Sequence, residues 1–256
     1  MTSSSGKPVS ILAFFIYILA ALFLFYEMAL QSSPGVMTHQ LMRDLHTDAG
    51  GLGMIAGFYF YSYTLMQIPA GLIFDRLNTR WIITLAILVC VTGAFFFGLT
   101  HTVMQAAAGR FFMGLGSAFA FIGVLVVASR WFEPQYFAFL VGVAQLLAAI
   151  GALGGELPLS TAVNTFGWRQ TINGLAVFGV ILAVICFLVI RHKKTRVSDS
   201  NTQEQLSVLA SLKEVLGRGQ TWWVALYAFA GWAPITVFAE LWGVPFLEHM
   251  YHINNT

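Results

Sequence analysis

Charged residues are scarce in this 256-residue chain. Aspartate, glutamate, lysine and arginine together make up 9% of it, against about 25% in an average soluble domain. Cysteine is also rare: Cys90 and Cys186 both fall in apolar runs, where they act as small hydrophobic residues. Neither a disulfide nor a metal site is therefore expected. The formal net charge is only +2, so no nucleic-acid partner is expected.

Apolar residues make up 58% of the chain and occur in long blocks. Seven runs without a charged residue reach the ~18 residues that a helix needs to cross a hydrocarbon core. These runs are Pro8–Tyr26, Ala49–Phe74, Trp81–Gly109, Phe111–Ser129, Pro134–Gly155, Gln170–Ile190 and Gly219–Ala239. The alternation typical of β-barrel strands is absent. The sequence thus predicts an all-α membrane protein, and we interpret its first run as a retained helix rather than a signal peptide.

Helices are expected near residues 11–33, 51–72, 80–99, 103–128, 135–156, 169–190 and 220–246. If the N-terminus is cytoplasmic, ten lysines and arginines fall on the cytoplasmic side, and only Arg43 and Arg169 fall on the other. This asymmetry favours a multi-pass integral membrane protein with a cytoplasmic N-terminus.

One sizeable polar segment interrupts the apolar blocks, and it predicts the organisation of the chain. Residues 1–190 are expected to form a six-helix transmembrane bundle, 191–219 a cytoplasmic linker and 220–256 the first helix of an incomplete second bundle. The linker begins basic and rich in serine and asparagine, which is typical of a flexible connection. Leucines at helical spacing between Gln203 and Leu216 predict a short amphipathic surface helix.

The segment Gly71–Arg80 reads GLIFDRLNTR. It resembles the G-x-L-x-D-R-x-G-R-[RK] loop of major facilitator superfamily transporters, with Asn78 in place of the usual second glycine. Because asparagine tolerates positive φ better than most residues, the turn can survive this change. The pattern of Arg110, Gly114 and Gly116 is similar to that family's R-x-x-x-G-x-G on helix four.

Two further segments carry the resemblance. The fifth predicted helix has a glycine-rich stretch with a proline, as in the family, and Gly167-Trp168-Arg169 opens the sixth. The glycines and the proline of this stretch are Gly142, Gly151, Gly154, Gly155 and Pro158. The resemblance implies the N-terminal half of the major facilitator fold plus helix seven, completed by a missing C-terminal half or by a second copy of the chain.

By this resemblance the whole protein is a secondary transporter, not an enzyme, that moves a small-molecule substrate through the lipid bilayer by alternating access, as symport or uniport. Residues 26–37 and 58–76 are similar to bacterial relatives of the lysosomal dipeptide transporter. That similarity favours an amino acid or short peptide as substrate and the bacterial inner membrane as location. The alternative is a truncated, non-transporting half-protein with a structural or regulatory role. No cofactor is expected, and proton coupling is an open alternative.

Arg110 is the most informative polar residue within a predicted span. A central arginine costs about 2.5–3.5 kcal/mol on translocon scales, so it normally faces a bundle interior or a wet cavity. We expect Arg110 to bind a substrate carboxylate or to balance a protonatable acid; snorkelling to the membrane surface is the alternative. Glu27 on the first helix is the main acid candidate, with a position at the membrane interface as its alternative.

Three more residues are candidates for substrate binding or coupling. Glu240 follows a weak point at Gly231 and Pro234 that resembles the broken helices of transporters. Tyr63 and Gln67 share one face of the second helix and are expected either to line the cavity or to lie in an interfacial aromatic belt.

The resemblance also implies a cytoplasmic gate made of Gly71, Asp75, Arg76 and Arg80. Topology alone explains the arginines but not Asp75. We expect the Asp75 carboxylate to accept hydrogen bonds from Arg80 and from the N-terminus of a neighbouring helix. The remaining matched residues are expected to serve close packing or a hinge: Gly114, Gly116, Gly151, Gly154, Gly155 and Pro158.

Overall fold

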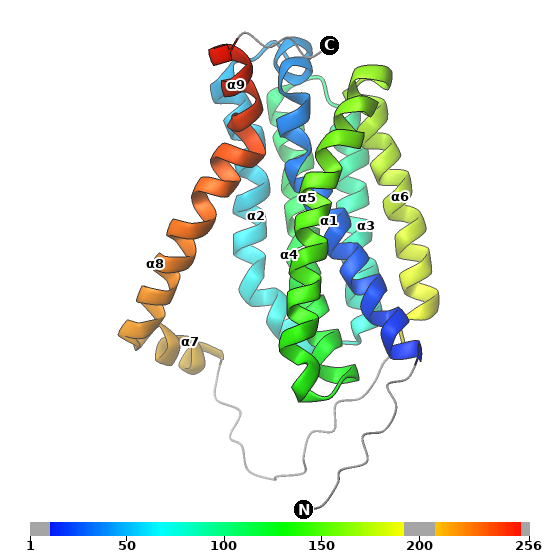
Figure 1. Ribbon diagram of the computed structural model, residues 1–256, viewed down its shortest axis with the longest axis vertical. Coiled ribbons are helices and arrows are strands. Elements are labelled where there is room, and N and C mark those ends of the chain that lie inside the picture. The colour runs from blue at the N-terminus through cyan, green and yellow to red at the C-terminus, as the bar shows by residue number, and fades with distance from the viewer. Residues whose placement is uncertain (1–10, 192–207, 252–256) are drawn as a thin grey trace, which may run out of the picture. The chain divides into compact units, whose positions relative to one another are not determined.

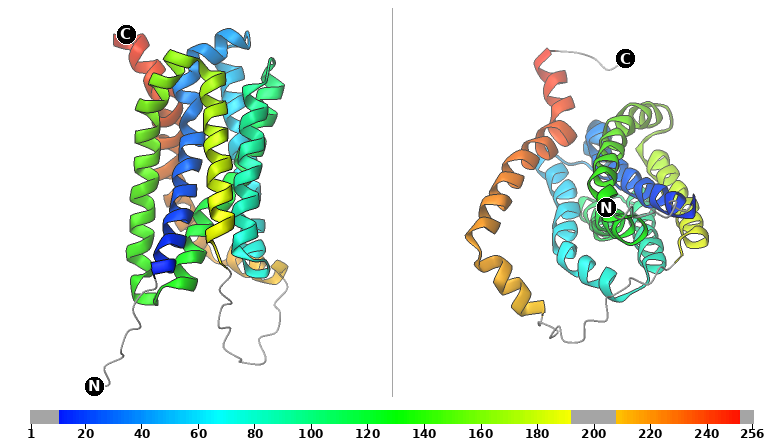
Figure 2. Two further views of the ribbon diagram at one scale, coloured as in Figure 1. Left: turned by 90° about the vertical axis from the view of Figure 1, so that its right-hand side faces the viewer. Right: turned by 60° about the horizontal axis from the view of Figure 1, so that its bottom comes forward.

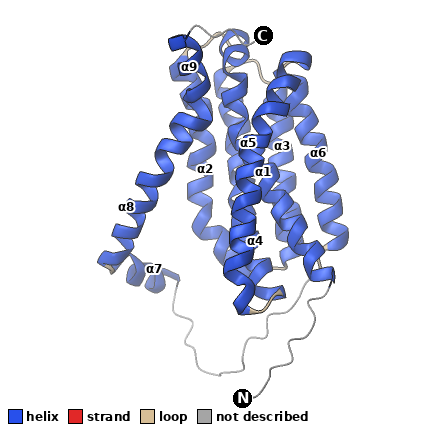
Figure 3. Cartoon of the chain, in the orientation of Figure 1, coloured by secondary structure: helices blue, strands red, loops and turns tan. Residues whose placement is uncertain are grey.

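The computed structural model describes residues 11–191 and 208–251, except for the side chains of residues 153–157, 208–212, 239–241, 244–245 and 248–249. All regular structure in this part of the chain is helical (Figure 1 and Figure 3). The chain divides into two compact units, Met1–Lys193 and Lys194–Thr256. The predicted all-α fold class is confirmed.

The first unit is a bundle of six long helices built around α1 and α4. The helices are α1 (Ile11–Asp44), α2 (Ala49–Arg76), α3 (Thr79–Gly98), α4 (Val103–Trp131), α5 (Phe137–Phe166) and α6 (Trp168–Val189), with a 3-10 turn η1 (Pro134–Tyr136) before α5. Helix α4 packs against α1, α2 and α3. Helix α1 also packs against α5 and α6, and lies between them in Figure 2.

Polar side chains at three short connections begin the following helices. Asp48, Asn78 and Thr102 accept hydrogen bonds from backbone amides in the first turns of α2, α3 and α4 respectively. These are the usual N-cap contacts, which satisfy amides that lack a partner within the helix. Asn78 has φ −71°, so the turn does not use the positive φ that asparagine tolerates, and the role of Asn78 here is to cap α3.

Two helices are longer than the sequence predicts because neither stops at its internal proline. Helix α1 passes Pro34 and ends at Asp44, and α5 passes Pro158 and ends at Phe166. Within α1, the Ser33 hydroxyl donates a 2.8 Å hydrogen bond to the Leu30 carbonyl, the oxygen that Pro34 leaves without its usual backbone donor. A proline removes one backbone donor but does not prevent the helix from continuing when neighbouring groups replace that donor.

Six described helical stretches are long and apolar enough to cross a membrane: Ile11–Asp44, Thr79–Gly98, Val103–Trp131, Pro134–Ala152, Trp168–Val189 and Gly219–Phe238. Helix α2 is not among them, because glycines, three tyrosines and Gln67 interrupt its apolar residues. It packs along α4, and we therefore infer that it crosses the membrane with the bundle. The most polar of the six bundle helices thus lies beside the central one.

The second unit contains α7 (Val208–Gly217), α8 (Gly219–Pro234), η2 (Ile235–Trp242) and α9 (Gly243–Tyr251). Helix α7 covers part of the predicted amphipathic helix, whereas residues 192–207 of the predicted linker lie outside the described residues. The η2 stretch is a π-helix that directly follows Pro234. The helical winding therefore changes next to the predicted weak point, in a form that is frequent at functional sites.

Candidate functional site

Arg110 points from α4 into the bundle and contacts the backbone of α1. Its side chain is 1% exposed. The guanidinium donates a 2.6 Å hydrogen bond from Nη1 to the Leu30 carbonyl and a 3.1 Å bond from Nη2 to the Gln31 carbonyl. Arg110 is therefore held in the interior and does not snorkel to the membrane surface.

The Leu30 carbonyl is available to Arg110 because of Pro34. In an unbroken helix the carbonyl of residue 30 accepts from the amide of residue 34, but proline has no N–H group. Both the Arg110 guanidinium and the Ser33 hydroxyl, at 2.8 Å, donate to this oxygen instead. A buried carbonyl without a partner would be costly, so the arginine of α4 stabilises the irregular turn of α1.

Glu27 and Tyr59 complete a buried polar cluster with Arg110, in which α1, α2 and α4 each supply one side chain. Glu27 is 1% exposed and lies near the middle of α1, inside the bundle. The Tyr59 hydroxyl donates a 2.7 Å hydrogen bond to Glu27 Oε1, and the Tyr59 ring lies 4.4 Å from the Arg110 guanidinium carbon. Tyr59 thus touches both the buried acid and the buried base, which is how an aromatic ring can stabilise a cation and a carboxylate together.

Tyr63 and Gln67 continue from this cluster along α2. The Tyr63 ring stacks on Tyr59 with centroids 6.1 Å apart and planes 12° from parallel. Both Tyr63 and Gln67 are half-buried. Helix α2 therefore carries polar groups from the buried cluster toward the end of the bundle that bears Asp75. Glu240, the other predicted coupling residue, has its side chain outside the described part of the structure.

Two glycines of α4 bring this helix close to its neighbours α2 and α3. A Cβ atom on Gly114 would overlap the Tyr59 carbonyl and the Ser62 hydroxyl on α2. On Gly116 it would overlap the Ala86 carbonyl on α3. Helix α4 thus packs closely against α2 on one side and α3 on the other, at positions where only a glycine fits.

Helix α5 makes a similar close approach to α1. A Cβ atom on Gly151 would lie 3.0 Å from the Phe25 carbonyl oxygen. Gly154 and Gly155 belong to α5, but their surroundings lie outside the described part of the structure, and Pro158 is exposed. The hinge role predicted for these residues stays a prediction.

At the predicted gate, the expected contacts of Asp75 are not formed. Asp75 and Arg76 are exposed, and no hydrogen bond or ion pair involves the Asp75 side chain among the described residues. The Arg80 amide already donates to Asn78 Oδ1, and the Arg80 guanidinium lies 3.8 Å from the centre of the Phe187 ring on α6. Both of the donors expected for Asp75 are therefore directed elsewhere. Gly71, one turn earlier, has open space around it.

Sequence reasoning missed Arg130, which joins three helix ends near this gate. From the last turn of α4, its guanidinium donates 2.9 Å to Thr79 Oγ1 and 2.7 Å to the Phe74 carbonyl. The carbonyls at the end of a helix have no partner within it, so Arg130 satisfies α2 where it ends and contacts α3 where it begins. In the sequence, the positive charge of Arg130 indicated only that its loop lies on the cytoplasmic side of the membrane.

A second missed cluster lies at the opposite ends of α1 and α6. Asp44 accepts hydrogen bonds from Arg169, at 2.9 Å, and from the Trp168 indole, at 3.0 Å. Arg169 also donates to the Thr100 carbonyl, and Gln40 accepts from the Trp168 amide. The Gly167-Trp168-Arg169 segment was visible in the sequence, but its partner Asp44 was not.

Long apolar helices that enclose a buried acid and a buried base at their central crossing define a helical membrane protein with a polar interior site. The family model of the Major Facilitator Superfamily matches residues 8–254. The chain belongs to this superfamily and is a multi-pass integral membrane protein.

Several transporters of Bacillus subtilis (strain 168) are similar to this chain. The uncharacterized transporter YybO is 24% identical over 80% of this chain and 50% of its own length. The nitrite extrusion protein is 23% identical over 78% of this chain and 48% of its own length. The probable galactarate/D-glucarate transporter GudP is 24% identical over 85% of this chain and 50% of its own length. The chain therefore spans about half the length of the curated relatives that it matches, and these relatives are transporters rather than enzymes.

A solved structure shows the same fold. The bacterial homologue of the human lysosomal transporter Spinster, in its inward-facing and unoccupied conformation, superposes with a TM-score of 0.77 at 18% identity. The alignment covers 98% of this chain and 58% of the other. The predicted major facilitator fold, incomplete in this chain, is confirmed. The finer resemblance to the lysosomal dipeptide branch stays a prediction.

Proposed function

We propose that this chain is the N-terminal half of a secondary transporter that moves a small carboxylate-bearing solute by alternating access in a bacterial inner membrane. Amino acids, short peptides and sugar acids belong to this class. The observation that carries the proposal is the buried cluster of Glu27, Tyr59 and Arg110, where α1, α2 and α4 meet. The excess of lysine and arginine in alternate loops supports a cytoplasmic N-terminus.

Arg110 supplies the chemistry that recognises a carboxylate. A guanidinium has five N–H donors in a planar fork that matches two carboxylate oxygens. In this structure two of its nitrogens donate to carbonyls of α1. A substrate carboxylate that reaches Arg110 would compete with these carbonyls, so that substrate binding loosens the contact between α4 and α1. This competition links the presence of substrate to the position of a central helix. The names of GudP and of the nitrite extrusion protein, both transporters of anions, support an anionic substrate for this chain.

Glu27 provides a means of coupling transport to protons. An ionised Glu27 repels an anionic substrate in this low-dielectric interior, whereas a protonated one does not. The anion is thus favoured when Glu27 carries a proton, and the two enter together. This is symport, with Tyr59 as the group that senses the state of Glu27, because its hydroxyl donates to that carboxylate.

The test uses the full-length protein in proteoliposomes with an imposed pH gradient. Labelled glucarate, an amino acid and a dipeptide are compared as substrates, and both accumulation and counterflow exchange are measured. We expect accumulation of one carboxylate class, competed by its acid and not by the matching amide. Glu27→Gln should lose gradient-driven accumulation but retain exchange, whereas Glu133→Gln, on the exposed α4–α5 connection, should behave as the unmodified protein. Equal inhibition by the uncharged amide would overturn the substrate class, and accumulation by Glu27→Gln would overturn the coupling role.

A further inference from the structure

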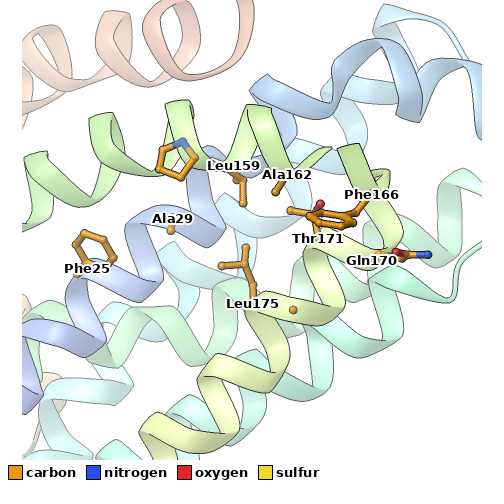
Figure 4. A pocket seen from close by; sticks show the side chains of 10 residues that line it. Phe25, Ala29, Leu159, Ala162, Phe166, Gln170, Thr171 and Leu175 are labelled. Carbon is orange, nitrogen blue, oxygen red and sulfur yellow. The ribbon is translucent and has the colours of Figure 1, made fainter. Parts of the chain in front are cut away.

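A cavity of about 520 Å³ lies between α5 and α6, with α1 as its floor. Phe25 and Ala29 of α1, Leu159 and Ala162 of α5, and Leu175 of α6 converge on it (Figure 4). Its volume is within the range of small-molecule sites, about 300–1,000 Å³. None of its lining residues belongs to the buried cluster of Glu27, Tyr59 and Arg110. The cavity is thus separate from the proposed transport site.

Close contacts bound this cavity at both ends. At one end α5 meets α1, where a Cβ atom on Gly151 would lie 3.0 Å from the Phe25 carbonyl oxygen. At the other end α5 and α6 are joined at Gly167, whose φ of 81° allows the sharp turn. Between these points residues of both α5 and α6 line the cavity.

The polarity of the cavity changes along its length. Among its described lining residues, the polar side chains are Gln170 and Thr171, in the first turn of α6, where that membrane-crossing helix enters the bilayer. Deeper in, the lining is apolar. From Pro158 to Phe166 the cavity follows nine residues of α5, or about 12 Å of helix. This is less than one leaflet of the hydrocarbon core, about 15 Å.

The surface around the mouth is also apolar. On α6, Val177, Phe178 and Ile181 are exposed, one to two turns beyond the lining residue Gly174. A large exposed apolar surface on membrane-crossing helices faces lipid. An opening at this depth, within such a surface, therefore meets hydrocarbon rather than water.

We propose that this cavity is a binding site for one acyl chain of a bilayer phospholipid. The polar end at Gln170 and Thr171 lies at the headgroup level, and the chain runs inward over Phe25 and Ala29. An amphiphile has the same sequence of polar and apolar parts as the cavity, and its chain fits within one leaflet. Because Phe25 and Ala29 are on the side of α1 away from Glu27 and Leu30, the bound chain supports α1 from behind where α4 contacts it.

The experiment is photocrosslinking of the full-length protein in vesicles of phosphatidylethanolamine that carries a diazirine at one defined chain carbon. Crosslinked residues are identified by mass spectrometry. With the diazirine close to the headgroup we expect labels at Gln170 and Phe166; with the diazirine near mid-chain we expect labels at Leu159, Leu175 and Phe25. This depth order requires no variant, so it tests the proposal even where a substitution impairs folding.

A filled cavity provides the second arm. A Cβ atom on Gly174 would meet no atom within 4 Å, so Gly174→Leu extends into the cavity, and it should abolish the mid-chain labels there while labels at Val184 on the outer face of α6 persist. Val177→Leu, one turn along α6, is the matched control and should change neither. If the cavity and Val184 are labelled in equal yield and Gly174→Leu changes neither label, the labels come from the surrounding bulk lipid and not from a bound chain. No labels at these residues, with the labels at Val184 retained, would show that a protein segment such as the second half or a second copy covers the cavity. Either result overturns the proposal.

Discussion

The Arg110 guanidinium on α4 donates a 2.6 Å hydrogen bond to the Leu30 carbonyl on α1, across 80 positions of sequence. Pro34 leaves that carbonyl without a backbone donor. The arginine is therefore an integral part of the α1 turn as well as the cation of the buried cluster. Because Arg110 takes part in both, a change in the buried cluster can alter the contact between α4 and the α1 turn.

The dependence of Arg110 on Pro34 is testable by a double-mutant cycle. Arg110→Lys replaces a fork by a point donor and should lower the free energy of unfolding by about 1.5–3 kcal/mol, the value of a charged hydrogen bond. In a Pro34→Ala background, residue 34 can donate to Leu30, so the same substitution should cost less. Thermal unfolding in detergent measures all four proteins. Additive effects, within about 0.5 kcal/mol, would show that the two residues act independently.

Tyr59→Phe removes the hydroxyl that donates to Glu27 but keeps the ring beneath Arg110. We expect the protein to fold. Its initial uptake rate should fall about tenfold, because the lost hydrogen bond to a charged group is worth about 1.4 kcal/mol, which corresponds to a factor of ten in rate. Tyr61→Phe, whose side chain is 64% exposed, is the control and should transport normally. Unimpaired uptake by Tyr59→Phe would remove Tyr59 from the proposed mechanism.

Gly114→Ala tests the α2–α4 crossing. The added methyl overlaps the Tyr59 carbonyl, so the free energy of unfolding should fall by about 1–3 kcal/mol. At Gly142 in α5 an added Cβ meets nothing within 4 Å. Gly142→Ala should therefore be neutral, or stabilise the helix by up to about 1 kcal/mol. Thermal unfolding of the two variants decides whether the close contact or helix propensity controls stability. Equal shifts in melting temperature for the two variants would contradict a role for the close contact.

The gate can be separated from its structural support by Asp75→Asn and Arg130→Gln. The Asp75 side chain makes no hydrogen bond or ion pair with the described residues. We therefore expect Asp75→Asn to leave insertion and melting temperature unchanged while uptake falls, since a gate residue acts in another conformation of the transport cycle. Arg130→Gln removes hydrogen bonds of 2.9 and 2.7 Å and should lower the melting temperature. Uptake rates and thermal unfolding of both variants provide the measurement. Unchanged uptake in Asp75→Asn would argue against the gate.

Much of the fold was predictable because hydrocarbon leaves few choices. Backbone groups in lipid must pair internally, so long apolar runs become helices, and the starts of these helices were close to those observed. Their ends were less predictable. The expected spans ended at residues 33 and 156, just before the two prolines, but α1 and α5 continue to Asp44 and Phe166. At Pro34, the Ser33 hydroxyl and the Arg110 guanidinium replace the missing donor.

The candidate site was predictable in its residues but not in its contacts. The cost of a buried charge identified Glu27 and Arg110, and helical spacing placed Tyr63 and Gln67 on one face of α2. Tyr59 was visible on that same face, yet no pattern indicated that it would join the acid to the base. Arg130 and Asp44 were missed because their partners lie 51 to 125 positions away in the chain.

By itself the sequence determined a helical, multi-pass membrane protein of a recognisable superfamily, since run length and local spacing express the demands of lipid and of close glycine contacts. Only the tertiary structure decided which polar groups contact one another. Arg110 binds the α1 backbone, Arg80 turns to Phe187, and Asp75 stays exposed, because each of these outcomes depends on which helices pack together. Hydrogen bonds between helices depend on distance and direction in space, and neither is written in residue order.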